Sequence, residues 1–201
     1  MKIRSASGNT HTKVRPARML FPRTIETRRM KLSRWEPADA VAFRPIAQDP
    51  AVMRYVNNGE PWSDEKVREF IARQMRHIAH NGFCFWKIQR KPDGRLIGLC
   101  GLQALHLGCR WEVEIGWWLT PRNWGRGLAS EAASAVMTAA RRSLRRNRVV
   151  AIAVAENHAS RRIMEKIGMR YERDVRHRGI AVVLYATRAE ASSQSPRGTI
   201  D

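Results

Sequence analysis

Acidic residues are scarce in this sequence. The 201-residue chain has 18 Asp and Glu against 37 Lys and Arg, which gives a formal net charge of +19. A chain this basic attracts polyanions in general, so nucleic acid and phosphate-bearing cofactors are both open as partners. The excess begins at the N-terminus, where residues 1–25 contain no acid and six basic residues: Lys2, Arg4, Lys13, Arg15, Arg18 and Arg23.

Cysteine is also rare, and long apolar runs are missing. Cys84, Cys100 and Cys109 are odd in number and form no disulfide framework, which favours a reducing compartment, and we expect a cytoplasmic protein. No apolar stretch approaches the roughly 20 residues that cross a bilayer, and residues 1–25 lack the apolar core of a secretory signal. We therefore expect no membrane association.

Complete metal-binding and nucleotide-binding motifs are absent as well. His77 with His80, and His106 with Cys109, have ligand-like spacing, but neither pair has a matching second pair, so we expect no metal. A Walker loop at 125–127 would need Lys-Ser/Thr next, where Leu128-Ala129 stands. A dinucleotide fingerprint would need a third glycine in register.

The order of periodic segments predicts one α+β domain. With 43% hydrophobic residues, the chain can bury a single core. We expect a disordered basic leader at 1–23, the domain at 24–188 and a disordered tail at 189–201. Within the domain the patterns predict strands at 24–35, 83–89, 96–105, 111–119 and 149–155, helices at 37–47, 63–81, 125–144 and 157–168, and a closing hairpin.

The passage from 111 to 155 has the length of a right-handed strand–helix–strand crossover. We therefore expect the strands at 111–119 and 149–155 to be parallel, and the other strands to be mainly antiparallel. The result is a mixed, mostly antiparallel sheet with helices on its faces.

The stretch TPRNWGRGLASEA (120–132) stands where the strand becomes the long helix. Unpaired N–H groups and the macrodipole favour an anion at a helix start. Gly125 and Gly127 let the main chain wrap closely around a ligand, and Arg122 and Arg126 add positive charge, which suits a pyrophosphate. The alternative reading is an ordinary turn with solvated arginines.

Several segments carry a family resemblance. Arg122-Asn-Trp-Gly-Arg-Gly-Leu-Ala129 is similar to the R/Q-x-x-G-x-G/A-x-A acetyl-CoA signature of the GNAT N-acetyltransferase superfamily. IETRRMKLSRWEPAD (25–39), DPAVMRYV (49–56) and ENHASRRIMEKIGMRYE (156–172) resemble segments of the branch that includes ribosomal-protein N-terminal acetyltransferases. The resemblance extends, in order, over about residues 24–187.

This resemblance implies a sheet splayed between the strands at 111–119 and 149–155, with acetyl-CoA in the opening. The thioester arm would pair with the strand edge near Trp118 and Leu119, as an added strand does. Asn157 matches the asparagine that contacts pantetheine, and it could equally cap the helix that follows. The implied cofactor-binding residues are Trp118, Leu119, Arg122, Asn123, Trp124, Gly125, Arg126, Gly127, Leu128, Ala129 and Asn157.

The resemblance also implies catalytic residues. We expect Glu114 to be the general base, directly or through water, although Glu112 and Glu114 could instead pair with nearby arginines. Ser160 would hydrogen-bond the leaving thiolate, or it is simply a small helix residue. Met164 stands where many relatives have a general-acid tyrosine. We assign Trp62 and Glu112 to the acceptor side.

Together these features predict an acetyl-CoA-dependent N-acetyltransferase that acts on a primary amine by direct attack in a ternary complex. The amine would be a protein N-terminus or a small molecule, and the enzyme a monomer or homodimer. The alternative is a basic RNA- or ribosome-associated binding module that keeps the fold without catalysis. The basic leader and RRSLRRNR (141–148) would then hold RNA or a ribosomal surface, and weak association of this kind is compatible with the enzyme too.

Overall fold

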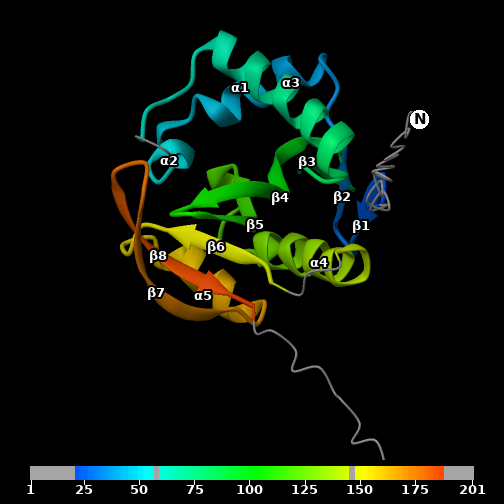
Figure 1. Cartoon of the computed structure of the whole chain (residues 1–201). Coiled ribbons are helices and arrows are strands. Elements are labelled where there is room, and N and C mark those ends of the chain that lie inside the picture. The colour runs from blue at the N-terminus through cyan, green and yellow to red at the C-terminus, as the bar shows by residue number, and fades with distance from the viewer. Residues whose placement is uncertain (1–20, 57–58, 145–147, 188–201) are drawn as a thin grey trace, which may run out of the picture.

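A single eight-stranded sheet organises the chain (Figure 1). The computed structural model describes residues 21–56, 59–144 and 148–187. The strands lie in the order β1-β2-β3-β4-β5-β6-β8-β7. Their bounds are β1 (Thr24–Glu26), β2 (Met30–Ser33), β3 (Phe85–Arg90), β4 (Leu96–Leu107), β5 (Arg110–Leu119), β6 (Val150–Ala153), β7 (Arg170–His177) and β8 (Ile180–Ala186).

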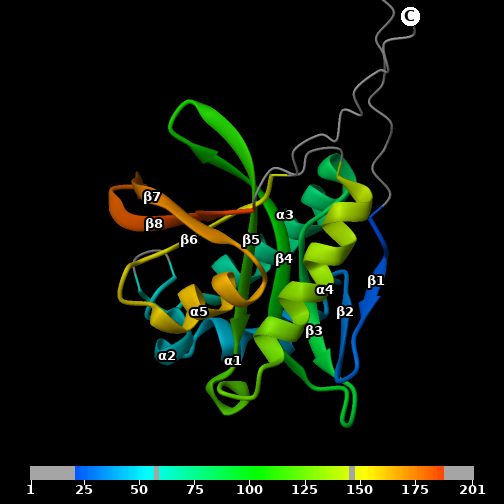
Figure 2. The same cartoon turned by 90° about the horizontal axis from the view of Figure 1, so that it is seen from below.

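The sheet opens between β5 and β6. This neighbouring pair is parallel, as the crossover length predicts, and the remaining pairs are antiparallel. Glu114 and Val150 are the single pair of Cα partners that join β5 to β6, whereas β4 and β5 are paired from Gly98–Leu119 to Leu107–Arg110. Figure 2 shows β6 turning away from β5 beyond this junction. The predicted splayed, mostly antiparallel α+β sheet is confirmed.

Helices cover both faces of the sheet (Figure 1). One face carries α1 (Asp39–Ala47), α2 (Pro50–Met53) and α3 (Asp64–Asn81), and the other carries α4 (Leu128–Ser143) and α5 (His158–Lys166). Alternation along β5 divides its side chains between the faces, because successive residues of a strand point to opposite sides. Ile115 packs under α4, and Trp118 packs with the aromatic side chains of α1 and α3.

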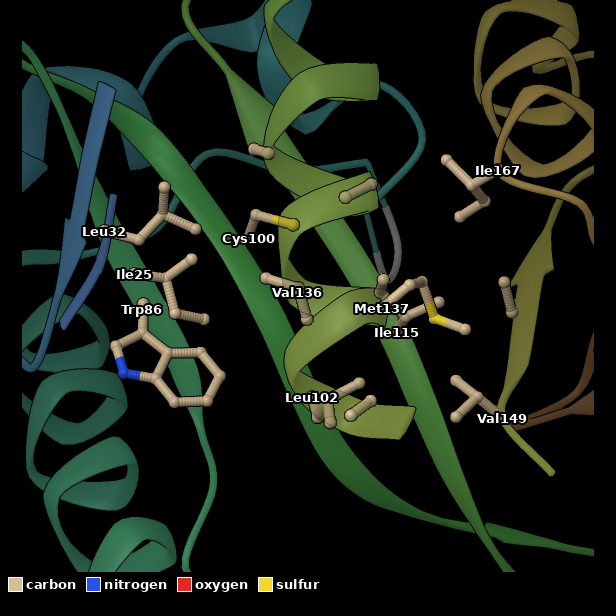
Figure 3. Close-up of a cluster of buried hydrophobic side chains, with 14 of the residues drawn as sticks. Ile25, Leu32, Trp86, Cys100, Leu102, Ile115, Val136, Met137, Val149 and Ile167 are labelled. Atoms are coloured by element: carbon tan, nitrogen blue, oxygen red, sulfur yellow. The ribbon is translucent and has the colours of Figure 1, made fainter. Parts of the chain in front are cut away.

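The larger hydrophobic core lies between the sheet and α4. Figure 3 shows Val136 and Met137 of α4 against Cys100, Leu102 and Ile115 of the central strands. All five side chains are buried. This core fixes the direction of α4 and therefore the position of the loop that precedes it.

Local signals explain most helix ends. Ser63 Oγ accepts a hydrogen bond from the Lys66 N–H, and Gly82 adopts a left-handed φ of 78° after α3, so the helix lies close to the expected bounds of 63–81. The short helix α2 was not predicted, although Asp49 caps it by accepting from the Ala51 N–H and Pro50 fills its first position.

Two predicted element boundaries were wrong. The segment expected as one strand at 24–35 is two antiparallel strands, because Thr27 closes a tight turn in which its hydroxyl accepts from the Met30 N–H. The long helix expected from about residue 125 begins at Leu128, since Gly125 and Gly127 both have left-handed φ values of 70°.

Some predictions concern residues outside the described ranges. The basic leader up to residue 20, the tail from 188 and residues 145–147 of the arginine cluster are among these, so RNA or ribosome association stays a prediction. Within the described ranges, none of the helices is both long enough and apolar enough to span a bilayer. In the same ranges, no three His, Cys, Asp or Glu side chains gather as metal ligands.

Candidate active site

The loop between β5 and α4 forms one end of the site. After the short 3-10 helix η1 (Pro121–Asn123), Gly125 and Gly127 turn the chain into α4. A Cβ built on Gly125 would meet nothing within 4 Å, so the main chain faces open space there. The loop is held by its own side chains: Asn123 Nδ2 donates to Thr120 Oγ1 at 2.6 Å, and the Trp124 indole donates to the Leu119 carbonyl at 2.7 Å.

The first turn of α4 presents unpaired N–H groups. Gly127 provides no side-chain cap, and the first backbone bond of the helix is donated by Glu131 to the Gly127 carbonyl. Within the described parts of the chain, no oxygen accepts from the N–H groups of Leu128, Ala129 or Ser130. Unsatisfied donors at the positive end of a helix dipole suit a phosphate group. The residues present therefore fit the pyrophosphate of a CoA thioester.

Arg29 supports this loop from the turn between β1 and β2. Its Nε donates to Glu131 Oε2 at 2.7 Å, its backbone N–H donates to Glu131 Oε1 at 3.0 Å, and its Nη1 donates to the Arg126 carbonyl at 2.9 Å. A residue about 100 positions earlier in sequence thus fixes both sides of the glycine turn. Sequence reasoning missed Arg29 and Glu131, because nothing in the local pattern links them.

A long cleft of about 2270 Å³ runs from this loop across the opening between β5 and β6. Its walls come from α2, α3, β4, β5, α4, β6, α5 and the β7–β8 hairpin. The structure brings most of the predicted site residues to this cleft: Trp62, Glu114, Trp118, Leu119, Asn123, Trp124, Gly125, Gly127, Leu128, Ala129, Asn157 and Ser160. The side chains of Arg122 and Arg126 are exposed beside it and do not line it.

Glu114 is the buried carboxyl group of the cleft. It is 8% exposed, and its Oε2 accepts a hydrogen bond from Gln103, the residue opposite it on β4. Burial raises the pKa of Glu114 to about 7, an effect that the Gln103 hydrogen bond and the charge of Arg178 partly oppose. A carboxyl group with a pKa near 7 can both accept and release a proton at neutral pH. Gln103 was not predicted, and only the strand register reveals it.

Glu112 has a different environment from Glu114. Arg148 Nε donates to its carboxylate at 3.2 Å, and the same guanidinium donates to Glu172 at 2.8 and 3.1 Å. Glu112 is not among the described residues that line the cleft. The arginine pairing that the sequence left open for both carboxylates therefore exists at Glu112. Its assignment to the acceptor side stays a prediction without support from its position.

The start of α5 forms the wall opposite β5. Asn157 caps the helix by accepting from the Ser160 N–H at 3.1 Å, and both residues line the cleft. Met164, in the position of the family's tyrosine, is buried at the cleft wall. Tyr171 is exposed and its hydroxyl donates to Asp174 at 3.0 Å, so Tyr171 does not replace the missing tyrosine.

Trp62 lies in an aromatic cluster above the cleft. Its ring is edge-on to Trp118 at 5.2 Å and tilted against Phe70 at 5.3 Å. The side chain is buried, and its indole nitrogen has no hydrogen-bond partner among the described residues. A buried donor without a partner costs free energy, which a bound acceptor group would recover.

Comparisons with known proteins agree with this geometry. A solved acetyltransferase of the GNAT family from Bacillus anthracis is 27% identical, with a TM-score of 0.68 over 81% of this chain and 96% of that chain. RimL, a ribosomal L7/L12 α-N-protein acetyltransferase solved in complex with coenzyme A, shares the fold, with a TM-score of 0.69, 19% identity and coverage of 81% and 96%. The fold, with its open sheet, is thus shared with known acetyltransferases.

The sequence comparisons give the family. The model of the acetyltransferase (GNAT) domain matches residues 29–170. The uncharacterized N-acetyltransferase YnaD of Bacillus subtilis is 32% identical over 148 residues, which are 74% of this chain and 83% of that protein. The chain belongs to the GNAT acetyltransferase family.

Proposed function

We propose that this protein transfers the acetyl group of acetyl-CoA to a primary amine by direct attack in a ternary complex. The observation that carries the proposal is a continuous cleft with unpaired α4 N–H groups at one end and the buried carboxyl of Glu114 further in. One surface can therefore hold a phosphate-bearing donor and deprotonate an acceptor.

Binding of the donor would use groups that have no other partner. The N–H groups of Leu128, Ala129 and Ser130 would receive the pyrophosphate. The opening between β5 and β6 leaves the β5 edge beyond Glu114 without strand partners on that side, which suits an extended amide-bearing arm. The Leu119 carbonyl already accepts from Trp124, and the Trp118 carbonyl faces Gly98 of β4, so the arm would pair with other groups of this edge, such as those of Trp117. Bound acetyl-CoA would supply the thioester.

The chemistry assigned to this chain is the movement of two protons. Glu114 would accept a proton from the ammonium group of the acceptor, because its raised pKa makes it a base near neutrality. The amine nitrogen would then bond to the acyl carbon as the carbon–sulfur bond breaks. Ser160 lines the opposite wall and would stabilise the sulfur as it gains charge, with the proton coming from Ser160, water or solvent.

Direct transfer is supported by the cysteines. A covalent acyl carrier would need a reactive thiolate in the cleft, but burial raises the pKa of Cys84 to about 12. Cys100 is buried as well, and burial raises its pKa further. Cys109 is exposed, and it is not among the described residues lining the cleft. Acceptor and donor would therefore be held together.

The test combines donor binding with product mass. Purified protein should bind acetyl-CoA saturably in calorimetry and add about 42 Da, an acetyl group in place of one hydrogen, to members of a panel of amines and short peptides. Gly125→Val should weaken acetyl-CoA binding by roughly 10-fold or more, because the side chain would fill the open cradle. Unchanged binding by this variant, or no mass gain on any amine, would refute the proposal.

Gly94→Val is the matched control. Gly94 has a similar left-handed φ of 66° and no neighbour within 4 Å of an added Cβ, but it lies in the β3–β4 turn away from the cleft. It carries the same backbone strain as Gly125→Val. Acetyl-CoA binding should survive in the control.

A further inference from the structure

Basic side chains gather where α3 faces the β7–β8 hairpin across the cleft. Arg73 and His77 come from α3, and His177 and Arg178 come from the hairpin turn; all four line the cleft, and we call them the basic end. Figure 1 shows this turn rising from the sheet toward the layer of helices α1 to α3. Arg54 and Lys66 continue the positive charge along the same wall, where Glu69 is an acid that also lines the cleft.

The basic end lies at the level of Glu114. Two contacts show that α3 and β5 run side by side. Phe70 of α3 stacks with Trp118 of β5 at 5.9 Å. Four residues further along α3, the Gln74 side chain accepts from the Phe85 N–H, and the Phe85 ring would be 3.1 Å from a Cβ on Gly116 of β5. One turn of a helix and two residues of a strand each advance the chain by about 6 Å. Each further turn of α3 therefore lies beside the next residue on this face of β5. The next turn of α3 carries His77, and the next residue on this face of β5 is Glu114.

The hairpin turn holds Arg178 in an unusual backbone conformation. Arg178 has a φ of 50°, the one positive value among the described non-glycine residues, and Gly179 follows with a φ of 82°. Two-residue turns of this kind favour Asn-Gly, because asparagine tolerates left-handed geometry better than arginine does. Arg176 fastens the turn by donating to the Gly179 carbonyl at 3.0 Å. Strained residues of this kind cluster at binding sites.

The charges of the basic end are only weakly balanced, since Glu69 acts on Arg73 and Glu114 acts on Arg178 without a direct ion pair among the described residues. Neither Arg73 nor Arg178 forms an ion pair within the described residues. Burial, and after it the charges of Arg178 and Arg76, lower the pKa of Arg73. His77 Nδ1 is buried without a hydrogen-bond partner among the same residues. An anion placed here would relieve the repulsion and receive several donors.

We propose that the acceptor amine carries a carboxylate or phosphate group close to its nitrogen, and that Arg178 and Arg73 bind this anion. The inference rests on the proposed function, because it names the class of acceptor for the same cleft. The amine would lie at Glu114 and the anion at the basic end, so the acceptor would be held by charges of both signs. Such an arrangement also explains how a strongly basic protein admits a cationic amine.

The test compares matched acceptors with and without the anion, with kcat/KM expressed for the unprotonated amine of each. Ala-Asp-Asp-amide is paired with Ala-Asn-Asn-amide, alanine with alaninamide, and phosphoethanolamine with ethanolamine. At least one pair should favour the anionic member by roughly 10- to 100-fold in kcat/KM, the range expected from a charge-assisted hydrogen bond. The favoured pair identifies the source of the anion as a peptide side chain, an α-carboxylate or a phosphate. Equal kcat/KM within every pair would overturn the inference.

Arg178→Asn removes the charge while keeping a residue that suits the turn. This variant, and Arg73→Gln, should lower the ratio of anionic to neutral kcat/KM by about the same 10- to 100-fold. Arg68→Gln is the matched control, since Arg68 is an exposed arginine of α3 that is not among the described lining residues, and it should keep the wild-type ratio. A ratio that survives Arg178→Asn and Arg73→Gln contradicts the assignment.

A failure of the proposed function would look different. If the wild-type protein transferred acetyl groups to none of these amines, the proposed function would fail. Calorimetry would then still decide the inference: tighter binding of Ala-Asp-Asp-amide than of Ala-Asn-Asn-amide, lost in Arg178→Asn, would support an anion site at the basic end, and equal binding would overturn it.

Discussion

Arg29 and Glu131 are joined by two hydrogen bonds, one from the Arg29 backbone N–H and one from its guanidinium. The pair connects the β1–β2 turn to the first turn of α4, and the guanidinium Nη1 donates to the Arg126 carbonyl. The glycine loop is therefore fixed from outside the cleft, and its N–H groups stay directed toward the space that a ligand would fill. A loop rich in glycine needs such support, since its own backbone restrains it little.

We expect Glu131→Gln to weaken acetyl-CoA binding by roughly 3- to 10-fold and to lower the free energy of unfolding by about 1 kcal/mol, the scale of a partly exposed ion pair. Calorimetry and urea unfolding measure the two effects. Arg90→Gln is the control, because Arg90 pairs with Asp93 in the remote β3–β4 turn. It should affect stability alone, and equal loss of acetyl-CoA affinity in both variants would contradict a specific role for the Arg29–Glu131 pair.

The burial of Glu114 should reduce stability at high pH. Its pKa is about 7 in the folded protein against 4.5 for a free glutamate, so between these values the folded state keeps a proton that the unfolded chain has lost. The associated stability is fully present below about pH 4.5 and is lost as the pH rises through 7. Glu114→Gln should therefore stabilise the protein at pH 8, by up to roughly 3 kcal/mol, and change little near pH 4.5.

The same Glu114→Gln variant should lose about 10²-fold or more in kcat, the usual contribution of a general base. Urea unfolding at the two pH values and turnover at pH 8 measure both effects. Glu112→Gln is the matched control on the same strand, and it should lower stability slightly by removing the charge that pairs with Arg148. A Glu114→Gln enzyme with wild-type turnover would reject Glu114 as the base.

The sequence predicted those parts of the site that are continuous in the chain. Gly125 and Gly127 stand between a strand pattern and a helix pattern, and the crossover length predicted that the two flanking strands are parallel. Glycine turns, caps and periodicity act over a few residues, so a single sequence displays them. The Asn157 cap is of the same kind.

The sequence could not reveal contacts that depend on register and packing. Gln103 lies opposite Glu114 because β4 and β5 pair in one particular register. Arg148, just before β6, pairs with Glu112 and not with Glu114. Two carboxylates with the same pattern thus have different environments. Arg178 shows the same limit, since its place over the cleft follows from a left-handed turn that its residue type disfavours.

Ser160 offers a test of the leaving-group side of the cleft. Its backbone N–H is used by the Asn157 cap, while no hydrogen bond within the described residues involves its hydroxyl. Ser160→Ala should keep acetyl-CoA affinity and lower kcat by about 10-fold, the loss of one hydrogen bond to a charged group. Stopped-flow turnover checks it beside Ser134→Ala, an exposed serine of α4 outside the cleft lining, which should behave as wild type. Equal kcat in both variants would assign Ser160 a packing role.

The pH dependence of kcat/KM tests whether Arg178 of the basic end acts on Glu114. Glu114 must be ionised to accept a proton, so kcat/KM should rise with pH through an apparent pKa of about 7. The charge of Arg178 lowers the pKa of Glu114, although burial raises it more, so Arg178→Asn should move this apparent pKa upward. The acceptor amine titrates as well, but the same acceptor is used with both enzymes. A difference in apparent pKa between wild type and Arg178→Asn therefore comes from the protein. Alaninamide is used as the acceptor because it has no anionic group, so anion binding does not enter the comparison. An unchanged or lowered apparent pKa in Arg178→Asn would show that Arg178 and Glu114 do not interact.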